Sequence, residues 1–116
     1  MGFLGILKLI AGAVTIATGL LSLIKPRSVY GFTGLRAEGG RGITEIRSIL
    51  GALFIGLGTM VIIYRLPETY TMLGVTYLVI ALVRAVSMFI DKSLEKSNLI
   101  SLVSEIILGV ILVIPG

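Results

Sequence analysis

The chain contains neither cysteine nor histidine among its 116 residues. It therefore has no thiol for redox or nucleophilic chemistry, and it lacks the imidazole and thiolate ligands of the usual haem, zinc and iron sites. The residues that remain show no metal-ligand spacing and no nucleophile–base pair. We expect no metal, no cofactor, no catalytic residue and no enzymatic activity. A quinone remains a possible ligand, because it can bind without either residue type.

Charge is also scarce. Only 14% of the residues are charged and 56% are hydrophobic, and the mean hydropathy is +1.09. Soluble domains carry about 25% charged residues, so the composition indicates an integral membrane protein. The net charge of +4 would suggest a nucleic-acid partner in a soluble protein. Here the cations lie at helix ends and in loops, where they set membrane topology, and no nucleic-acid partner is expected.

Four apolar runs predict four membrane-spanning helices, over about residues 4–24, 44–64, 69–90 and 97–114. Proline follows the first, second and fourth runs, and a helix rarely continues through proline. Four spans of about 20 residues use most of the chain. The prediction is an all-α fold, an integral membrane four-helix bundle that forms a single domain over residues 1–116.

The distribution of cations predicts the orientation. The loops after the first and third runs, with their adjoining helix ends, carry seven cations: Lys25, Arg27, Arg36, Arg41, Arg47, Lys92 and Lys96. The opposite side carries only Lys8 and Arg65. This bias places the two basic loops in the cytoplasm and both termini outside. Lys8, four residues into the first run, is expected to extend its ammonium group to the outer interface.

Residues 27–42 (RSVYGFTGLRAEGGRG) form the longest connection. The segment is too long for a tight turn and too polar to span, so we expect it to lie in the headgroup region. A phosphate-binding loop is excluded, since no strand precedes the glycines and the Gly-Lys-Ser/Thr ending is missing. Arg36 and Arg41 are candidates for contact with anionic lipid phosphates. The alternative is an interfacial connector whose arginines only set topology.

Two charges interrupt the apolar runs. Arg84 lies seven residues before Asp91, which closes the third run, and Glu105 lies seven residues after Asn98, which precedes the fourth. At roughly 1.5 Å per residue, both lie about 10 Å deep on the same side of the membrane. An unpaired charge in hydrocarbon costs at least a few kcal/mol. We therefore predict a buried ion pair between Arg84 and Glu105.

Further polar residues accompany this pair at helical spacing. Tyr77, Arg84, Ser87 and Asp91 share one face of the third run, and Asn98, Ser101 and Glu105 share one face of the fourth. Glu45 and Arg47 begin the second run at the same level, so we expect them close to the pair, in a cluster whose charges sum to zero. The cluster is either a ligand site or a structural clasp that fixes helix packing. Tyr77 is either a ligand contact or a packed core residue.

Small residues mark helix faces that permit close approach. The pairs four residues apart are Ala13 and Ala17, Ala52 and Gly56, and Ala81 and Ala85, while Gly51 and Gly58 lie on a second face of the second run. Such faces support tight packing within the bundle, a homo-oligomer, or both.

Residues 45–58 (EIRSILGALFIGLG) resemble the second-helix signature of small bacterial membrane proteins related to DoxX. The chain is similar in particular to the four-span family called domain of unknown function 4345. That family carries an Arg, a Ser and an Asp in its third helix and a Glu in its fourth, in the order of Arg84, Ser87, Asp91 and Glu105. The resemblance implies a four-helix bundle in the plasma membrane of a prokaryote. Some DoxX relatives are subunits associated with quinone-linked sulfur oxidation and with redox defence.

Three hypotheses for function follow. In the first, the protein is a non-enzymatic membrane protein or accessory subunit whose polar core binds a lipid- or quinone-type amphiphile, with membrane lipids, a second copy or another membrane subunit as partners. In the second, oligomers form a small transporter or channel, since intramembrane charge also marks ion pathways. In the third, the protein is a scaffold without a ligand.

Overall fold

The structure is a computed structural model that describes residues 2–115, which form helices and no strand. The elements in chain order are α1 (Phe3–Ile24), the 3₁₀ turn η1 (Pro26–Ser28), α2 (Val29–Thr33), α3 (Gly39–Glu45), the π-helical segment η2 (Ile46–Leu53), α4 (Phe54–Tyr64), α5 (Pro67–Ile90) and α6 (Lys96–Val113). The elements α3, η2 and α4 run on without a break and form one helix, Gly39–Tyr64. Four helices are long and apolar enough to cross a membrane, so the predicted all-α transmembrane bundle is confirmed.

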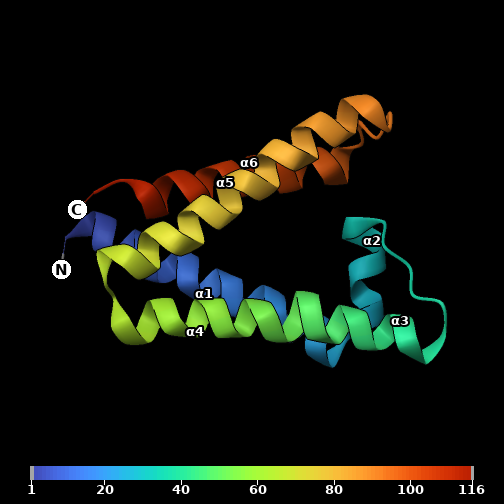
Figure 1. Cartoon of the computed structure of the whole chain (residues 1–116), viewed down its shortest axis with the longest axis horizontal. Coiled ribbons are helices and arrows are strands. Elements are labelled where there is room, and N and C mark those ends of the chain that lie inside the picture. The colour runs from blue at the N-terminus through green and yellow to red at the C-terminus, as the bar shows by residue number, and fades with distance from the viewer. Residues whose placement is uncertain (1, 116) are drawn as a thin grey trace.

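The helix ends follow the local sequence. Pro26 begins the 3₁₀ turn directly after Lys25, and Pro67 is the first residue of α5, where its fixed φ and missing N–H suit a helix start. Arg65 ends α4 in the left-handed region, with φ 51°. The connection between α4 and α5 is therefore very short, and the two helices are antiparallel neighbours (Figure 1).

The long connection differs from the prediction. Residues 29–33 form α2, and the second transmembrane helix starts at Gly39, five residues before the predicted start at residue 44. The Gly-Gly-Arg-Gly sequence is typical of a loop, but Arg41 forms an ion pair with Glu45 one turn later on the same helix. Pairs at this spacing stabilise helices. Only residues 34–38 of the connection are irregular.

The four long helices form two antiparallel pairs that splay apart from a common end (Figure 1). One pair is α1 with the helix Gly39–Tyr64, and the other is α5 with α6, and packing within each pair is far more extensive than between them. The pairs meet at the end of the molecule that holds both chain ends, which we call the narrow end. Helix α2 lies at the opposite end, where the pairs are apart, which we call the wide end. A core cluster at the narrow end draws buried side chains from all four helices: Ala11, Val61, Tyr70, Leu73, Tyr77 and Leu112.

Glycines set the approach of α1 to its partner helix. A Cβ atom on Gly58 would lie 2.6 Å from the carbonyl oxygen of Gly12, and one on Gly19 would lie 2.6 Å from that of Gly51. These distances are shorter than van der Waals contact. Backbone therefore packs directly on backbone at two crossings seven residues apart, as is common between membrane helices.

The predicted small-residue faces are used unevenly. Ala81 is buried in the bundle, whereas Ala13, Ala17, Ala52 and Gly56 are exposed on the outside of the monomer. The sequence thus located the small residues but did not identify which of them form the internal contacts. Of the predicted faces, the one formed by Gly51 and Gly58 carries the close packing, against Gly12 and Gly19 of α1.

We predict that Gly58→Ala destabilises the protein by about 1–3 kcal/mol, because the new methyl group would overpack the contact with α1. Gly56→Ala on the same helix is the matched control, since nothing lies within 4 Å of a Cβ atom there. The control should be neutral or more stable by about 0.5–1 kcal/mol, because alanine favours helix. Thermal unfolding in mild detergent measures both. Equal stability of the two variants would contradict the close approach at Gly58.

Candidate functional site

The Arg84–Glu105 pair joins α5 to α6 on the side that faces the gap between the helix pairs. Arg84 Nε donates to Glu105 Oε1 at 2.8 Å and Nη2 donates to Oε2 at 2.7 Å. The side chains are 30% and 12% exposed. This is the two-pronged geometry that makes arginine–carboxylate pairs strong and directional. The predicted ion pair is confirmed.

Asn98 makes a third hydrogen bond to the guanidinium group. Its Oδ1 accepts from Arg84 Nη1 at 2.9 Å, and its Nδ2 donates to the Ser93 carbonyl oxygen at 2.9 Å. The α5–α6 loop thereby fixes the amide, and the amide fixes the plane of the arginine. The sequence placed Asn98 on the polar face of the fourth run, but its bond to Arg84 was not predicted.

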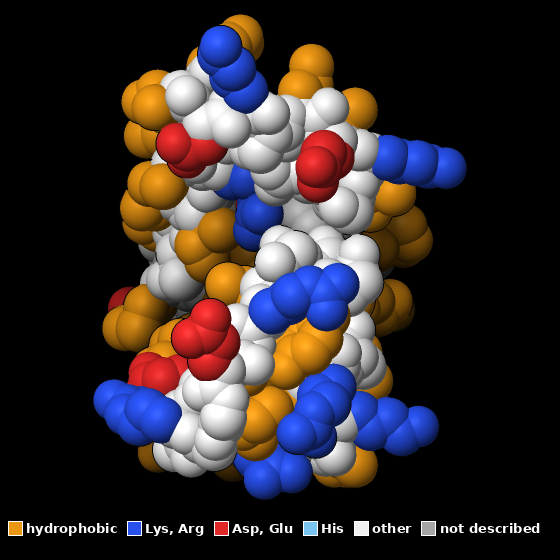
Figure 2. Space-filling model, turned by 90° about the vertical axis from the view of Figure 1, so that its right-hand side faces the viewer, with side chains coloured by type: hydrophobic (Ala, Val, Ile, Leu, Met, Phe, Trp, Pro, Cys, Tyr) orange, Lys and Arg blue, Asp and Glu red, His pale blue; other side chains and the backbone are white. Residues whose placement is uncertain are grey.

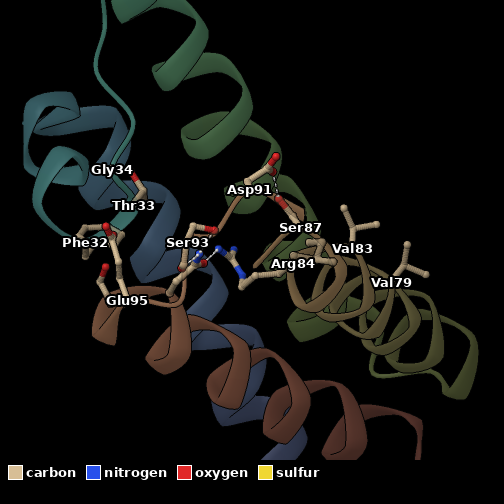
Figure 3. A pocket seen from close by; sticks show the side chains of 13 residues that line it. Phe32, Thr33, Gly34, Val79, Val83, Arg84, Ser87, Asp91, Ser93 and Glu95 are labelled. Carbon is tan, nitrogen blue, oxygen red and sulfur yellow. Dashed lines mark hydrogen bonds between the residues drawn. The ribbon is translucent and has the colours of Figure 1, made fainter. Parts of the chain in front are cut away.

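Two open cavities lie in the gap between the helix pairs and meet at this polar group. The inner cavity has a volume of about 470 Å³ and the outer one about 700 Å³. The residues that line both are Phe32, Thr33, Arg84 and Ser97. Figure 3 shows the outer cavity, with Phe32 and Thr33 of the α2 region facing Arg84 and Ser87 of α5 across it. Volumes of this size are typical of small-molecule sites.

The inner cavity is mainly apolar, with hydroxyl groups from α1, α2 and α6. Its apolar lining comes from Val14, Val29, Phe32, Leu50, Phe54, Ile100 and Leu108. Its hydroxyl lining comes from Thr18, Ser22, Thr33, Ser97, Ser101 and Ser104. Within residues 2–115, the hydroxyls of Ser97, Ser101 and Ser104 on α6 make no hydrogen bond. They are free to bond to a molecule in the cavity.

Tyr77 borders the inner cavity but also belongs to the core. Its Oη lies 2.5 Å from Thr15 Oγ1, and Thr15 in turn donates to the Ala11 carbonyl oxygen at 2.8 Å. Because the single Thr15 proton goes to Ala11, the tyrosine hydroxyl donates to Thr15. Tyr77 therefore links α5 to α1 at the base of the cavity, and its side chain is almost fully buried.

The structure corrects the prediction that Glu45 and Arg47 lie close to the Arg84–Glu105 pair. Glu45 pairs with Arg41 on the exposed surface of α3. Arg47 Nε donates to the Leu23 carbonyl oxygen at 3.1 Å. The last carbonyl groups of a helix have no partner within the helix, and Arg47 satisfies one at the end of α1. These residues were predicted at the same membrane level as the Arg84–Glu105 pair, but they do not contact it, because the helix pairs diverge at this level.

Lys8 is a buried residue that the sequence analysis did not assign to the core. The residue is 2% exposed, so its ammonium group is buried against the end of α6. Its Nζ donates to the carbonyl oxygens of Ile111, Leu112 and Ile114 at 2.9, 2.9 and 2.6 Å. The partial negative charge at a helix C-terminus favours a cation there. Two features were available to indicate this contact. Lys8 is the single cation in the first run, and the last helix ends without a capping side chain.

Arg36 and Arg41 both lie exposed at the wide end. The Arg36 guanidinium carbon lies 5.4 Å from the centre of the Tyr30 ring, and Arg41 pairs with Glu45. Figure 2 shows Lys and Arg side chains gathered over this end of the molecule. Contact of these two arginines with lipid phosphates stays a prediction. Among residues 2–115, no group of three or more acidic side chains is placed to hold a metal ion.

We predict that Arg84→Leu and Glu105→Leu each destabilise the protein more than the double change does. A single change leaves one charge buried without a partner, which typically costs about 3–5 kcal/mol, whereas apolar replacement of both is often tolerated. The exposed Arg41–Glu45 pair is the control, and its interaction energy should be far smaller, because solvent screens exposed ion pairs. Thermal unfolding of the single and double variants in detergent measures both. Additive losses at Arg84 and Glu105 would refute the coupling.

Comparison with known proteins assigns the chain to a family without assigning an activity. No curated protein and no solved structure matches it. The sequence model of one family, described as Domain of unknown function (DUF4345), matches residues 3–114. This match covers all four transmembrane helices and includes Arg84, Asn98 and Glu105. The chain therefore belongs to the DUF4345 family.

Proposed function

We propose that this small membrane protein is a non-enzymatic binder of one membrane amphiphile, a lipid or a quinone-type molecule, held between its two helix pairs. The observation that carries the proposal is the inner cavity, which is apolar along most of its wall and polar at the Arg84–Glu105 pair. An amphiphile needs both kinds of wall. Its tail would lie against Val14, Leu50 and Leu108, and its head against Arg84.

The shape of the bundle supports access from the membrane. The helix pairs separate toward the wide end, where α2 lies across the gap (Figure 1). Phe32 and Thr33 line both cavities. Helix α2 therefore lies between the outer and the inner cavity but closes the passage between them only partly. A sealed core, as expected of a scaffold without a ligand, would not leave cavities of about 470 and 700 Å³ next to an ion pair.

We also propose in which membrane the protein lies and which way it is oriented there. We infer a prokaryotic plasma membrane, with both termini outside and the wide end at the cytoplasmic face. The support is the concentration of Lys and Arg at that end (Figure 2) and the tendency of cytoplasmic loops to carry cations. We also infer a distant relationship to DoxX proteins, from the likeness of residues 45–58, and action as an accessory subunit or homo-oligomer. Exposed small residues on two helices, Ala13 and Ala17 on α1 and Ala52 and Gly56 on the helix Gly39–Tyr64, permit close approach of such a partner.

We predict that Ser101→Phe, which fills the inner cavity, removes an amphiphile that co-purifies with the unmodified protein. Val103→Phe is the matched control: it adds the same side chain to the same helix, at a residue that is 49% exposed and lines neither cavity. Native mass spectrometry from mild detergent should show one bound molecule per chain in the unmodified protein and the control. Occupancy in Ser101→Phe should fall at least fivefold.

Two outcomes would overturn this function. If the unmodified protein carries no bound molecule even after incubation with membrane lipid extract, the scaffold hypothesis is favoured. If the molecule stays bound in Ser101→Phe, it lies outside the cavity. Ion or solute flux through liposomes above background, lost in Arg84→Leu but unchanged in Ser101→Phe, would instead favour the transporter or channel hypothesis.

A further inference from the structure

The charged side chains that line the two cavities are mostly acidic, in contrast to the basic surface around them. Four charged residues line the cavities: Arg84, Asp91, Glu95 and Glu105. Three carboxylates therefore face one guanidinium group. Asp91 and Glu95 are exposed at the mouth, where Ser87 Oγ donates to Asp91 Oδ2 at 2.5 Å (Figure 3). The Lys and Arg side chains of the wide end, other than Arg84, line neither cavity.

The hydrogen bonds of Arg84 also argue against an anionic ligand. A guanidinium group has five N–H donors. Three of them bond to Glu105 and Asn98, which leaves two for a ligand. Glu105 occupies the edge formed by Nε and Nη2, and this edge is one that phosphate and carboxylate groups use for two-pronged binding. The site is therefore built around an internal anion.

We infer that the cavity selects amphiphiles whose head is uncharged and presents a carbonyl or similar acceptor oxygen to the two free N–H groups of Arg84. Ser97, which lines both cavities, is placed to bond to the same head. Anionic lipids are excluded, because their head would meet three carboxylates and an arginine already neutralised. This selectivity deepens the proposed function and rests on it. Anionic lipids are attracted to the basic surface of the wide end but do not enter.

The test is competition between two lipids with identical tails. The protein in mild detergent is incubated with equal amounts of dioleoylglycerol, which is uncharged, and dioleoylphosphatidic acid, which is anionic, and adducts are resolved by native mass spectrometry. Binding inside the cavity is the part that Ser101→Phe removes, whereas binding to the basic surface survives that change. In the unmodified protein, this cavity-dependent part should favour dioleoylglycerol at least tenfold.

Two sets of variants test the cause of the preference. Glu105→Gln keeps the shape of the side chain but frees the charge of Arg84, and it should reduce the preference at least tenfold or reverse it. Asp91→Asn with Glu95→Gln removes charge at the exposed mouth without touching the helix interior, and it should reduce the preference at least threefold. This second variant decides the matter if Glu105→Gln does not fold.

The outcomes separate the selectivity from the proposed function. Cavity-dependent binding of phosphatidic acid in the unmodified protein, or a preference unchanged in the folded variants, would overturn the selectivity and leave amphiphile binding in place. Absence of cavity-dependent binding of either lipid would overturn both.

Discussion

The ammonium group of Lys8 bonds to three backbone carbonyl groups at the end of α6 and so ties the first transmembrane helix to the last. These carbonyls have no partner within their own helix, and in a membrane an unsatisfied backbone group costs several kcal/mol. Tyr70 adds its ring, 5.3 Å from the Lys8 nitrogen. The two helix pairs are thus held together at the narrow end, beside the core cluster. The polar residues farther along can then face a gap.

The structure assigns different roles to the charges inside the bundle. Lys8 closes the narrow end, while Arg84 and Glu105 join α5 to α6 within one helix pair and do not bridge the gap. An ion pair across the gap would draw the helix pairs together at the wide end. Because this pair lies on one wall, the cavity stays open and polar at one place. The pair therefore does not clasp the two helix pairs together.

The sequence predicted local features well and contacts between the helix pairs poorly. Apolar runs and prolines gave the four helices, and equal depth in adjacent antiparallel helices gave the Arg84–Glu105 pair. The cluster with Glu45 and Arg47 was wrong because depth fixes a level in the membrane but not which helices touch at that level. The buried position of Lys8 was missed for a related reason, since its partners are backbone carbonyls about 100 residues away, and no residue type marks those.

The helix pairs diverge from the Lys8 end toward the wide end (Figure 1). The chain has no cysteine, so spin labels can be attached to engineered cysteine pairs. Pulsed electron paramagnetic resonance in lipid nanodiscs then measures the distance between the two labels. Labels at positions 63 and 71 report on the narrow end, and labels at 49 and 86 on the wide end, all at exposed residues of the helix Gly39–Tyr64 and α5. We predict a clearly longer distance between positions 49 and 86 than between positions 63 and 71. Equal distances at both ends would show a parallel, closed bundle and would contradict it.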